Sequence, residues 1–148
     1  MLRSFRHAVF PLLILLVAAT ALPGCARQAA RDTQAFPREN LPPQVQAAPA
    51  VVQETYQFAA SSPDLMQAIP CYCGCGSIGH TSNYSCYVAG QNQDGSLRFD
   101  DHALGCSICV DITQDARRLQ KQGKSPAQIR AYIDDTYGKY GTSNMPPE

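Results

Sequence analysis

Three cysteines at alternate positions form the most chemically distinctive segment of the sequence. Cys71, Cys73 and Cys75 are each separated by one residue, within a run that also holds Gly74 and Gly76. A disulfide closed across a single residue is strained, so these three are poor partners for one another. In an extended backbone, alternate side chains lie on one side, so the three sulfurs can converge on one point. Closely spaced thiolates favour Cu(I), Zn or an iron–sulfur cluster.

A second cysteine pair, Cys106 and Cys109, stands at the start of a predicted helix, and Cys86 lies between the pair and the triplet. The helix dipole lowers the pKa of the first thiol, which serves metal ligation and thiol exchange equally. Three cysteines of the triplet and three elsewhere could also form three disulfides, which is the usual state outside the cytoplasm. A metal site and a disulfide framework therefore remain alternatives at this point.

Two histidines accompany the cysteines. His80 follows the triplet by five residues, and His102 precedes the pair by four. Either ring could add a nitrogen ligand, and Asp100, Asp101 or Asp111 could orient the rings from behind. We assign no catalytic residue. The predicted metal ligands are Cys71, Cys73, Cys75, His80, Cys86, His102, Cys106 and Cys109.

The N-terminus has the pattern of a bacterial lipoprotein signal peptide. Arg3 and Arg6 precede an apolar run that is too short for a comfortable membrane span. The run ends at Leu22-Pro23-Gly24-Cys25, a lipobox in which the cysteine thiol takes the diacylglyceryl group and further acyl (palmitate) chains follow. Residues 1–24 are therefore predicted to be removed, and Cys25 to carry the lipid. The alternative is an uncleaved anchor with an incidental cysteine.

Composition limits the function classes. Two of the twelve basic residues, Arg3 and Arg6, lie in the predicted signal, so ten basic residues face twelve acidic ones in the remainder. This balance gives no basic surface for nucleic acid, which we exclude as a partner. The chain has no Trp, and few of its aliphatic residues lie beyond the signal. A core this thin needs cross-links or a metal for stability.

Several elements must position these residues. Residues 25–49, rich in Ala, Gln and Pro, are predicted to be a flexible tether. Apolar spacing predicts a short helix from about residue 50, and Ser62-Pro63 begins another. Residues 71–79 have the composition of an irregular loop, Ser82-Asn83 that of a turn. Residues 84–89 and 97–99 are predicted to pair as a β-hairpin around an Asp-Gly turn.

The C-terminal third predicts a helical hairpin. One helix spans residues 106–121 and ends before Gly123; the other begins at Ser125-Pro126 and ends at Gly138. Residues 142–148 are predicted to be a frayed tail. The fold class is therefore mainly α: a small helical domain over residues 50–141, with a C-terminal helical hairpin, an irregular cysteine-rich loop and one short β-hairpin.

The segment 69–76, with the following Gly79-His80, Ser82-Asn83 and Cys86, resembles the bacterial lipoproteins named for their PCYCGC motif. The resemblance runs from about residue 56 to residue 141. It implies an extracytoplasmic lipoprotein with a metal site, which maps onto Cys71, Cys73, Cys75, His80, Cys86, Cys106 and Cys109. The C-terminal third is also faintly similar to the apocytochrome thiol reductase of cytochrome c maturation, which exchanges disulfides through paired cysteines.

These observations predict a protein of the bacterial cell envelope, anchored through Cys25 on the extracytoplasmic side of a membrane. Its expected function is to bind a soft metal ion, copper as Cu(I) or zinc, for metal handling or for delivery to a partner protein. One alternative is a thiol-disulfide oxidoreductase that uses Cys106 and Cys109, with a redox partner. The other is a disulfide-stapled interaction module.

Overall fold

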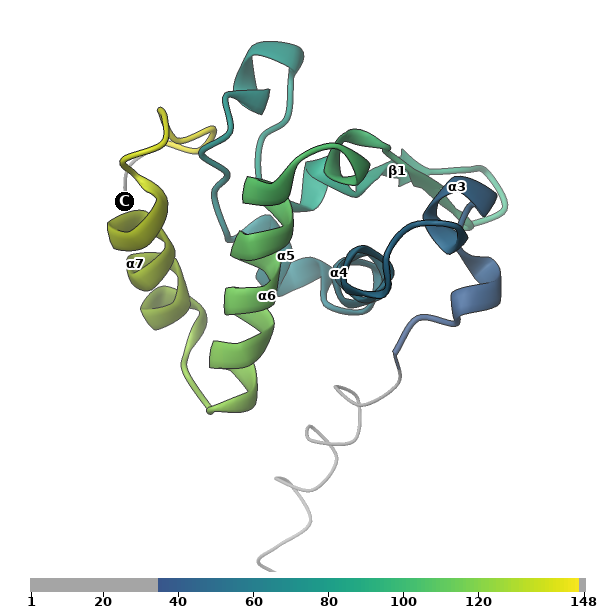
Figure 1. Ribbon diagram of the computed structural model, residues 1–148, viewed down its shortest axis with the longest axis horizontal. Coiled ribbons are helices and arrows are strands. Elements are labelled where there is room, and N and C mark those ends of the chain that lie inside the picture. The colour runs from purple at the N-terminus through teal and green to yellow at the C-terminus, as the bar shows by residue number, and fades with distance from the viewer. Residues whose placement is uncertain (1–34, 147–148) are drawn as a thin grey trace, which may run out of the picture. The chain divides into compact units, whose positions relative to one another are not determined.

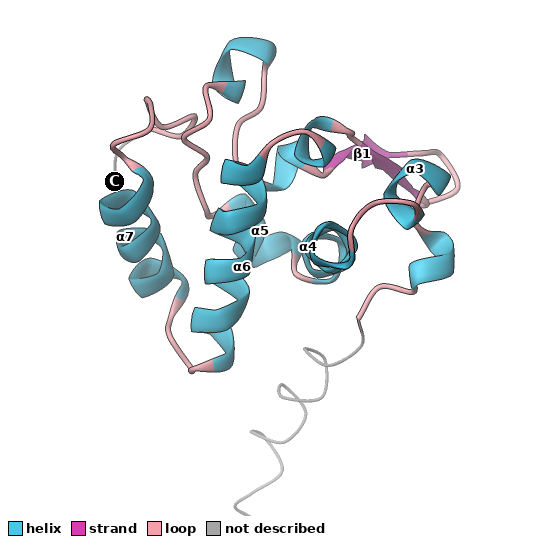
Figure 2. Ribbon diagram, in the orientation of Figure 1, coloured by secondary structure: helices cyan, strands magenta, loops and turns pink. Residues whose placement is uncertain are grey.

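The computed structural model describes residues 35–146, and the predicted signal peptide and Cys25 lie outside them. The described residues belong to one compact unit, most of it helical (Figures 1 and 2). None of its helices is long and apolar enough to cross a membrane. The elements in chain order are the 3₁₀ turn η1 (Arg38–Asn40), α3 (Pro43–Gln46), α4 (Ala50–Ser61), α5 (Pro63–Gln67), η2 (Cys75–Ile78), η3 (Tyr84–Cys86), β1 (Val88–Gln91), β2 (Leu97–Phe99), η4 (His102–Leu104), α6 (Ser107–Lys121) and α7 (Pro126–Tyr137).

The predicted helical hairpin is confirmed as α6 and α7, which lie side by side (Figure 1). Gly123 adopts the left-handed conformation just after α6, as its position predicts. Ser125 then begins α7 with a capping box: its hydroxyl accepts from the Gln128 N–H, and the Gln128 side chain accepts from the Ser125 N–H. The faces that pack inward carry Cys109, Ile112, Ala116, Leu119, Ile129, Ile133 and Tyr137.

Helix α4 packs against α6 and connects the core to the segment that carries the second histidine. The Tyr56 ring is fully buried and contacts the Tyr87 ring edge to face, with centroids 4.9 Å apart. The Tyr56 hydroxyl donates a hydrogen bond of 2.8 Å to the Asp100 carbonyl. The core therefore lies directly behind the cysteine-bearing segments and holds their backbone in place.

The predicted β-hairpin is present, but its first strand begins four residues later than expected. β1 and β2 pair antiparallel, while residues 84–86 form the turn η3. The Asn83 N–H donates to the Ile69 carbonyl, and the Asn83 amide donates to the Thr113 hydroxyl. These two buried bonds draw the chain inward before β1. Ser82-Asn83 is therefore a bend, as predicted, and also a tertiary contact, which its sequence did not indicate.

Both predicted ends of the domain need correction. Leu41 and Val45, within the expected tether, are only 3% and 1% exposed and pack beside α4. The Gln53 amide secures this segment by donating to the carbonyls of Gln46 and Ala48. Two apolar anchors thus order residues whose overall composition is typical of a linker.

At the other end, the segment that was predicted to fray packs on the cysteine loop. Just before it, a Cβ added to Gly141 would lie 2.7 Å from the Tyr72 carbonyl oxygen, so only glycine fits this crossing. Within the segment, the Asn144 N–H donates to the Cys71 carbonyl at 3.1 Å. The carbonyl of Pro146 accepts a bond of 2.7 Å from Arg130. Packed structure therefore continues to residue 146.

Candidate metal centre

The cysteine triplet lies in a loop that curls back on itself. Gly74 and Gly79 flank η2 with φ angles of +86° and +92°, a left-handed conformation that glycine adopts readily. The Cys71 and Cys73 sulfurs lie 3.4 Å apart, and all three sulfurs of the triplet lie within 4.8 Å of one another. The triplet therefore converges as its alternate spacing predicted.

The N-terminal end of α6 brings the second pair to the triplet. Cys106 is the N-cap residue of α6, and Cys109 lies in its first turn on the buried face. The Cys109 sulfur is 3.5 Å from the sulfur of Cys71 and 3.7 Å from that of Cys73. The structure therefore brings the triplet and the pair together at the start of α6.

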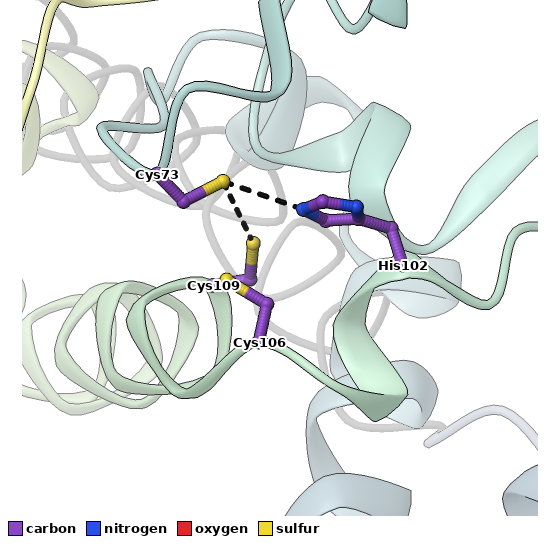
Figure 3. A group of neighbouring side chains, drawn as sticks. All are labelled: Cys73, His102, Cys106 and Cys109. Carbon is purple, nitrogen blue, oxygen red and sulfur yellow. Dashed lines mark hydrogen bonds between the residues drawn. The ribbon is translucent and has the colours of Figure 1, made fainter.

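His102 completes a group of four donors with this end of α6 (Figure 3). Its Nε2 lies 3.4 Å from the Cys73 sulfur, and the ring comes from the turn η4, just before α6. The donor atoms of Cys73, His102, Cys106 and Cys109 all lie within 4.8 Å of one another. Figure 3 shows these side chains pointing toward a common space from three separate segments.

A second group of four donors comprises Cys75, His80, Cys86 and again His102, with the same limit of 4.8 Å. The Cys75 and Cys86 sulfurs lie 3.6 Å apart. The two histidine rings meet edge to face, with centroids 5.1 Å apart. All eight predicted ligands therefore lie in one continuous cluster, although they come from residues 71–109.

The His80 ring has the burial and the partners expected of a ligating histidine. Its side chain is only 10% exposed, and its Nδ1 is buried without a hydrogen-bond partner. Its Nε2 lies 3.6 Å from Asp100 Oδ2. A ring held by a carboxylate on one nitrogen and bare on the other has the arrangement of a metal-binding histidine. The donor set thus fits a metal ion.

Asp100, one of the three candidates from the sequence, faces the His80 ring and holds the backbone of His102. Its Oδ1 accepts the His102 backbone N–H at 2.8 Å, while its Oδ2 faces His80. Asp101 and Asp111, the other two candidates, are exposed. A single carboxylate therefore links the His80 ring to the His102 backbone.

Asn144 is the main residue of the site that sequence reasoning missed. Its Oδ1 accepts the Cys71 N–H at 2.7 Å, and its own N–H donates to the Cys71 carbonyl. Its Nδ2 lies 3.6 Å from the Cys75 sulfur and donates to the His80 carbonyl at 3.2 Å. The C-terminal segment thus holds the cysteine loop closed at three points. No sequence signal marked a lone asparagine in a polar tail.

Buried hydroxyl groups hold the first turn of α6 from behind. The Tyr87 hydroxyl donates to the Cys109 carbonyl at 2.8 Å. The Thr113 hydroxyl lies 2.8 Å from the Tyr87 oxygen and 2.9 Å from the same carbonyl, and Asn83 donates to it. Tyr87 therefore fixes the position of the Cys109 backbone.

The six cysteines of the cluster are free thiols. Hydrogen bonds from the Cys109 and Cys86 thiols lower the pKa of Cys71. Burial, together with Cys71, raises the pKa of Cys73, and burial followed by the charge of Cys71 raises that of Cys75. Burial thus disfavours the charged form of the Cys73 and Cys75 thiols. Further ionisation of these buried sulfurs needs a cation, which a bound metal supplies.

A protein-family model matches most of the chain. A family described as a protein of unknown function with PCYCGC motif has a model that matches residues 14–147. No curated protein and no solved structure matches the chain. The weaker similarity to the apocytochrome thiol reductase therefore stays a prediction from the sequence.

Proposed function

Since the chain belongs to this family of PCYCGC-motif proteins, whose function is unknown, we propose its function from the site: it binds a soft metal ion for metal handling or delivery. The cysteine and histidine cluster has the geometry to hold a metal ion. The observation that carries the proposal is the meeting of six sulfurs and two imidazoles in groups whose donor atoms lie within 4.8 Å.

The spacing of the sulfurs supports a shared ion. Neighbouring sulfurs in the cluster lie 3.4 to 3.7 Å apart. Two thiolates on one tetrahedral zinc ion, with bonds of about 2.3 Å, lie roughly 3.8 Å apart. Bound metal therefore requires only small side-chain movements. Because soft thiolates outnumber imidazoles, we propose Cu(I) first and zinc second.

Direct metal titration tests this function. Under anaerobic conditions the reduced chain is titrated with Cu(I) and with Zn²⁺, and bound metal is measured; free thiols are counted in the untreated protein. We expect the reduced chain to bind Cu(I) or Zn²⁺ stoichiometrically. Three native disulfides, with no metal bound before or after gentle reduction, would instead support the stapled interaction module.

One observation favours the thiol-disulfide oxidoreductase as a second candidate. Cys106 is half-buried at the N-terminus of α6, and Cys109 is buried within reach of it. An accessible attacking thiol with a buried resolving thiol behind it suits disulfide exchange. Efficient reduction of a mixed-disulfide substrate that depends only on these two residues would establish this candidate. Dependence on the whole triplet would not, because two-cysteine exchange has no role for a third thiol.

We also propose that the protein works on the extracytoplasmic side of a bacterial membrane, held by lipid on Cys25 and passing metal to a partner protein. The lipobox and the preceding apolar run support this placement. Two or more acyl chains anchor firmly, since each buried methylene contributes about 0.8 kcal/mol.

Cys25→Ala should release the protein from membranes or leave it as an unprocessed precursor. The reason is that the cysteine thiol is the lipid acceptor, and signal cleavage follows lipid transfer. Membrane fractionation with an antibody against the chain measures both results, and Cys106→Ser serves as a cysteine control that leaves the lipobox intact. A Cys25→Ala protein that is cleaved yet still sediments with membranes would show that lipid is not the tether.

Asp100→Asn should weaken metal binding by about 10–100-fold, the usual effect of losing a carboxylate behind a ligating histidine. The asparagine oxygen can still accept the His102 N–H, so the change removes mainly the charge that faces His80. Competition with a chelator of known affinity gives the measurement. Asp101→Asn, at an exposed neighbouring position, should leave the affinity unchanged. Equal affinities for the two variants would contradict an orienting role for Asp100.

A further inference from the structure

The cluster holds more donors than one metal ion uses. Zinc in a structural site takes four ligands, whereas eight cysteine and histidine donors meet here. They fall into two sets. The outer set is Cys73, His102, Cys106 and Cys109. The inner set is Cys75, His80 and Cys86, with a fourth donor still to be assigned.

The fourth donor of the inner set is either His102 or Cys71. His102 lies within 4.8 Å of the donors of both sets, but its Nε2 already contacts Cys73 of the outer set. Cys71 belongs to neither set. Its sulfur lies 3.4 Å and 3.5 Å from the Cys73 and Cys109 sulfurs of the outer set, and within 4.8 Å of the Cys75 and Cys86 sulfurs. Because the outer set already holds four donors, Cys71 is left for the inner set. With Cys71 in the inner set, eight donors complete two four-coordinate ions and none is used twice. We propose that the protein binds two metal ions, an inference that rests on the proposed metal-binding function.

The two sets differ in access to solvent. Three of the four outer donors are half-buried. In the inner set, Cys75 is 3% exposed, Cys86 is fully buried, and Asn144 contacts Cys75 from the C-terminal segment. A chelator or a partner protein reaches the outer ion without opening the loop, whereas the inner ion lies behind it. The outer ion is therefore the exchangeable one, suited to delivery, and the inner ion is retained.

The hydrogen bonds around His80 support slow exchange of the inner ion. His80 presents a bare, buried Nδ1, and the peptide groups on both sides of its position are tied down: its N–H donates to the Cys75 carbonyl, and its carbonyl accepts from Asn144. A ring fixed in this way should dissociate slowly from a bound metal ion. The outer donors, in contrast, come from the edge of the loop, from η4 and from the N-terminus of α6 (Figure 3).

The experiment uses the full chain carrying Cys25→Ala, so that the six cluster cysteines are its only thiols. The reduced chain is titrated anaerobically with Zn²⁺, bound zinc is counted by native mass spectrometry, and its transfer to excess chelator is followed in time. Two ions per chain should bind and leave in a fast and a slow phase. Cys106→Ser should lose the fast phase, and His80→Gln the slow one.

The outcomes separate this inference from the proposed function. No bound zinc and no bound Cu(I) would overturn both. One ion per chain, or three or more, would overturn the two-ion inference and leave metal binding standing. Two ions that leave in one phase, or a Cys106→Ser chain that loses its slow phase instead, would overturn the assignment of outer and inner ions. Should a variant fail to fold, as judged by circular dichroism, the ion count and the phases of the parent chain still decide.

Discussion

Replacing Cys71, Cys73 and Cys75 by serine is expected to abolish the thermal stabilisation that metal gives the chain. An ion that binds only the folded state adds about 4 kcal/mol of stability at a free concentration a thousand times its Kd. For a domain of this size that corresponds to a rise in Tm of about 10–20 °C. The triplet supplies donors to every group of the cluster, so its loss leaves no complete site. Melting curves with and without metal measure the rise for each variant.

Two further variants make the result interpretable. Cys73→Ser changes only a half-buried sulfur and should reduce the rise without abolishing it. Ser77→Ala, in the same loop, should keep the full rise, because the Ser77 hydroxyl only donates to the Gly74 carbonyl. Each variant is compared with its own metal-free melting curve, which separates metal effects from packing effects. A triple variant that retains the parent rise would exclude the triplet as the metal ligands.

Asn144→Ala is expected to weaken metal binding by about 10–100-fold, although its contacts to the loop are hydrogen bonds and not metal bonds. Alanine leaves the partly buried Cys71 N–H without its acceptor and frees the Cys75 sulfur and the His80 carbonyl. The free energy of unfolding of the metal-free chain should also fall, by roughly 1–3 kcal/mol. Chelator competition and urea unfolding measure the two effects.

Asn92→Ala is the matched control for this change. Asn92 lies in the exposed turn of the β-hairpin, where its amide donates to Ser96. It should alter neither metal affinity nor, by more than a few tenths of a kcal/mol, stability. Equal metal affinities for the Asn144→Ala and parent chains would show that the C-terminal segment does not position the ligands.

Local signals made the helical part of the fold predictable. The apolar stripe of α6, the glycine after it and the Ser125-Pro126 start of α7 each act within a few residues, so their effect can be read directly. The convergence of Cys71, Cys73 and Cys75 also depends only on residues that are close together in the sequence. For these features the backbone follows from neighbouring residues alone.

The remaining features depend on contacts between distant residues. Leu41 and Val45 are isolated apolar residues among Ala, Gln and Pro, and only the surface of α4 gives them a place to pack. Asn144 acts 73 residues away from its partner Cys71. The late start of β1 follows from the burial of Asn83. None of these contacts has a period, a cap or a spacing that a single sequence would display.

The cysteine loop closes only after Asn144 has been synthesised and has packed against it. Cys71 is synthesised 73 residues before Asn144, the residue that closes its loop. Contacts of such large sequence separation form late in folding, because long loops must close first. A chain that is truncated or stalled before residue 144 therefore exposes reactive thiols without their proper geometry. Such chains should scramble into non-native disulfides under oxidising conditions, which makes synthesis of the segment around Asn144 the step that protects the thiols.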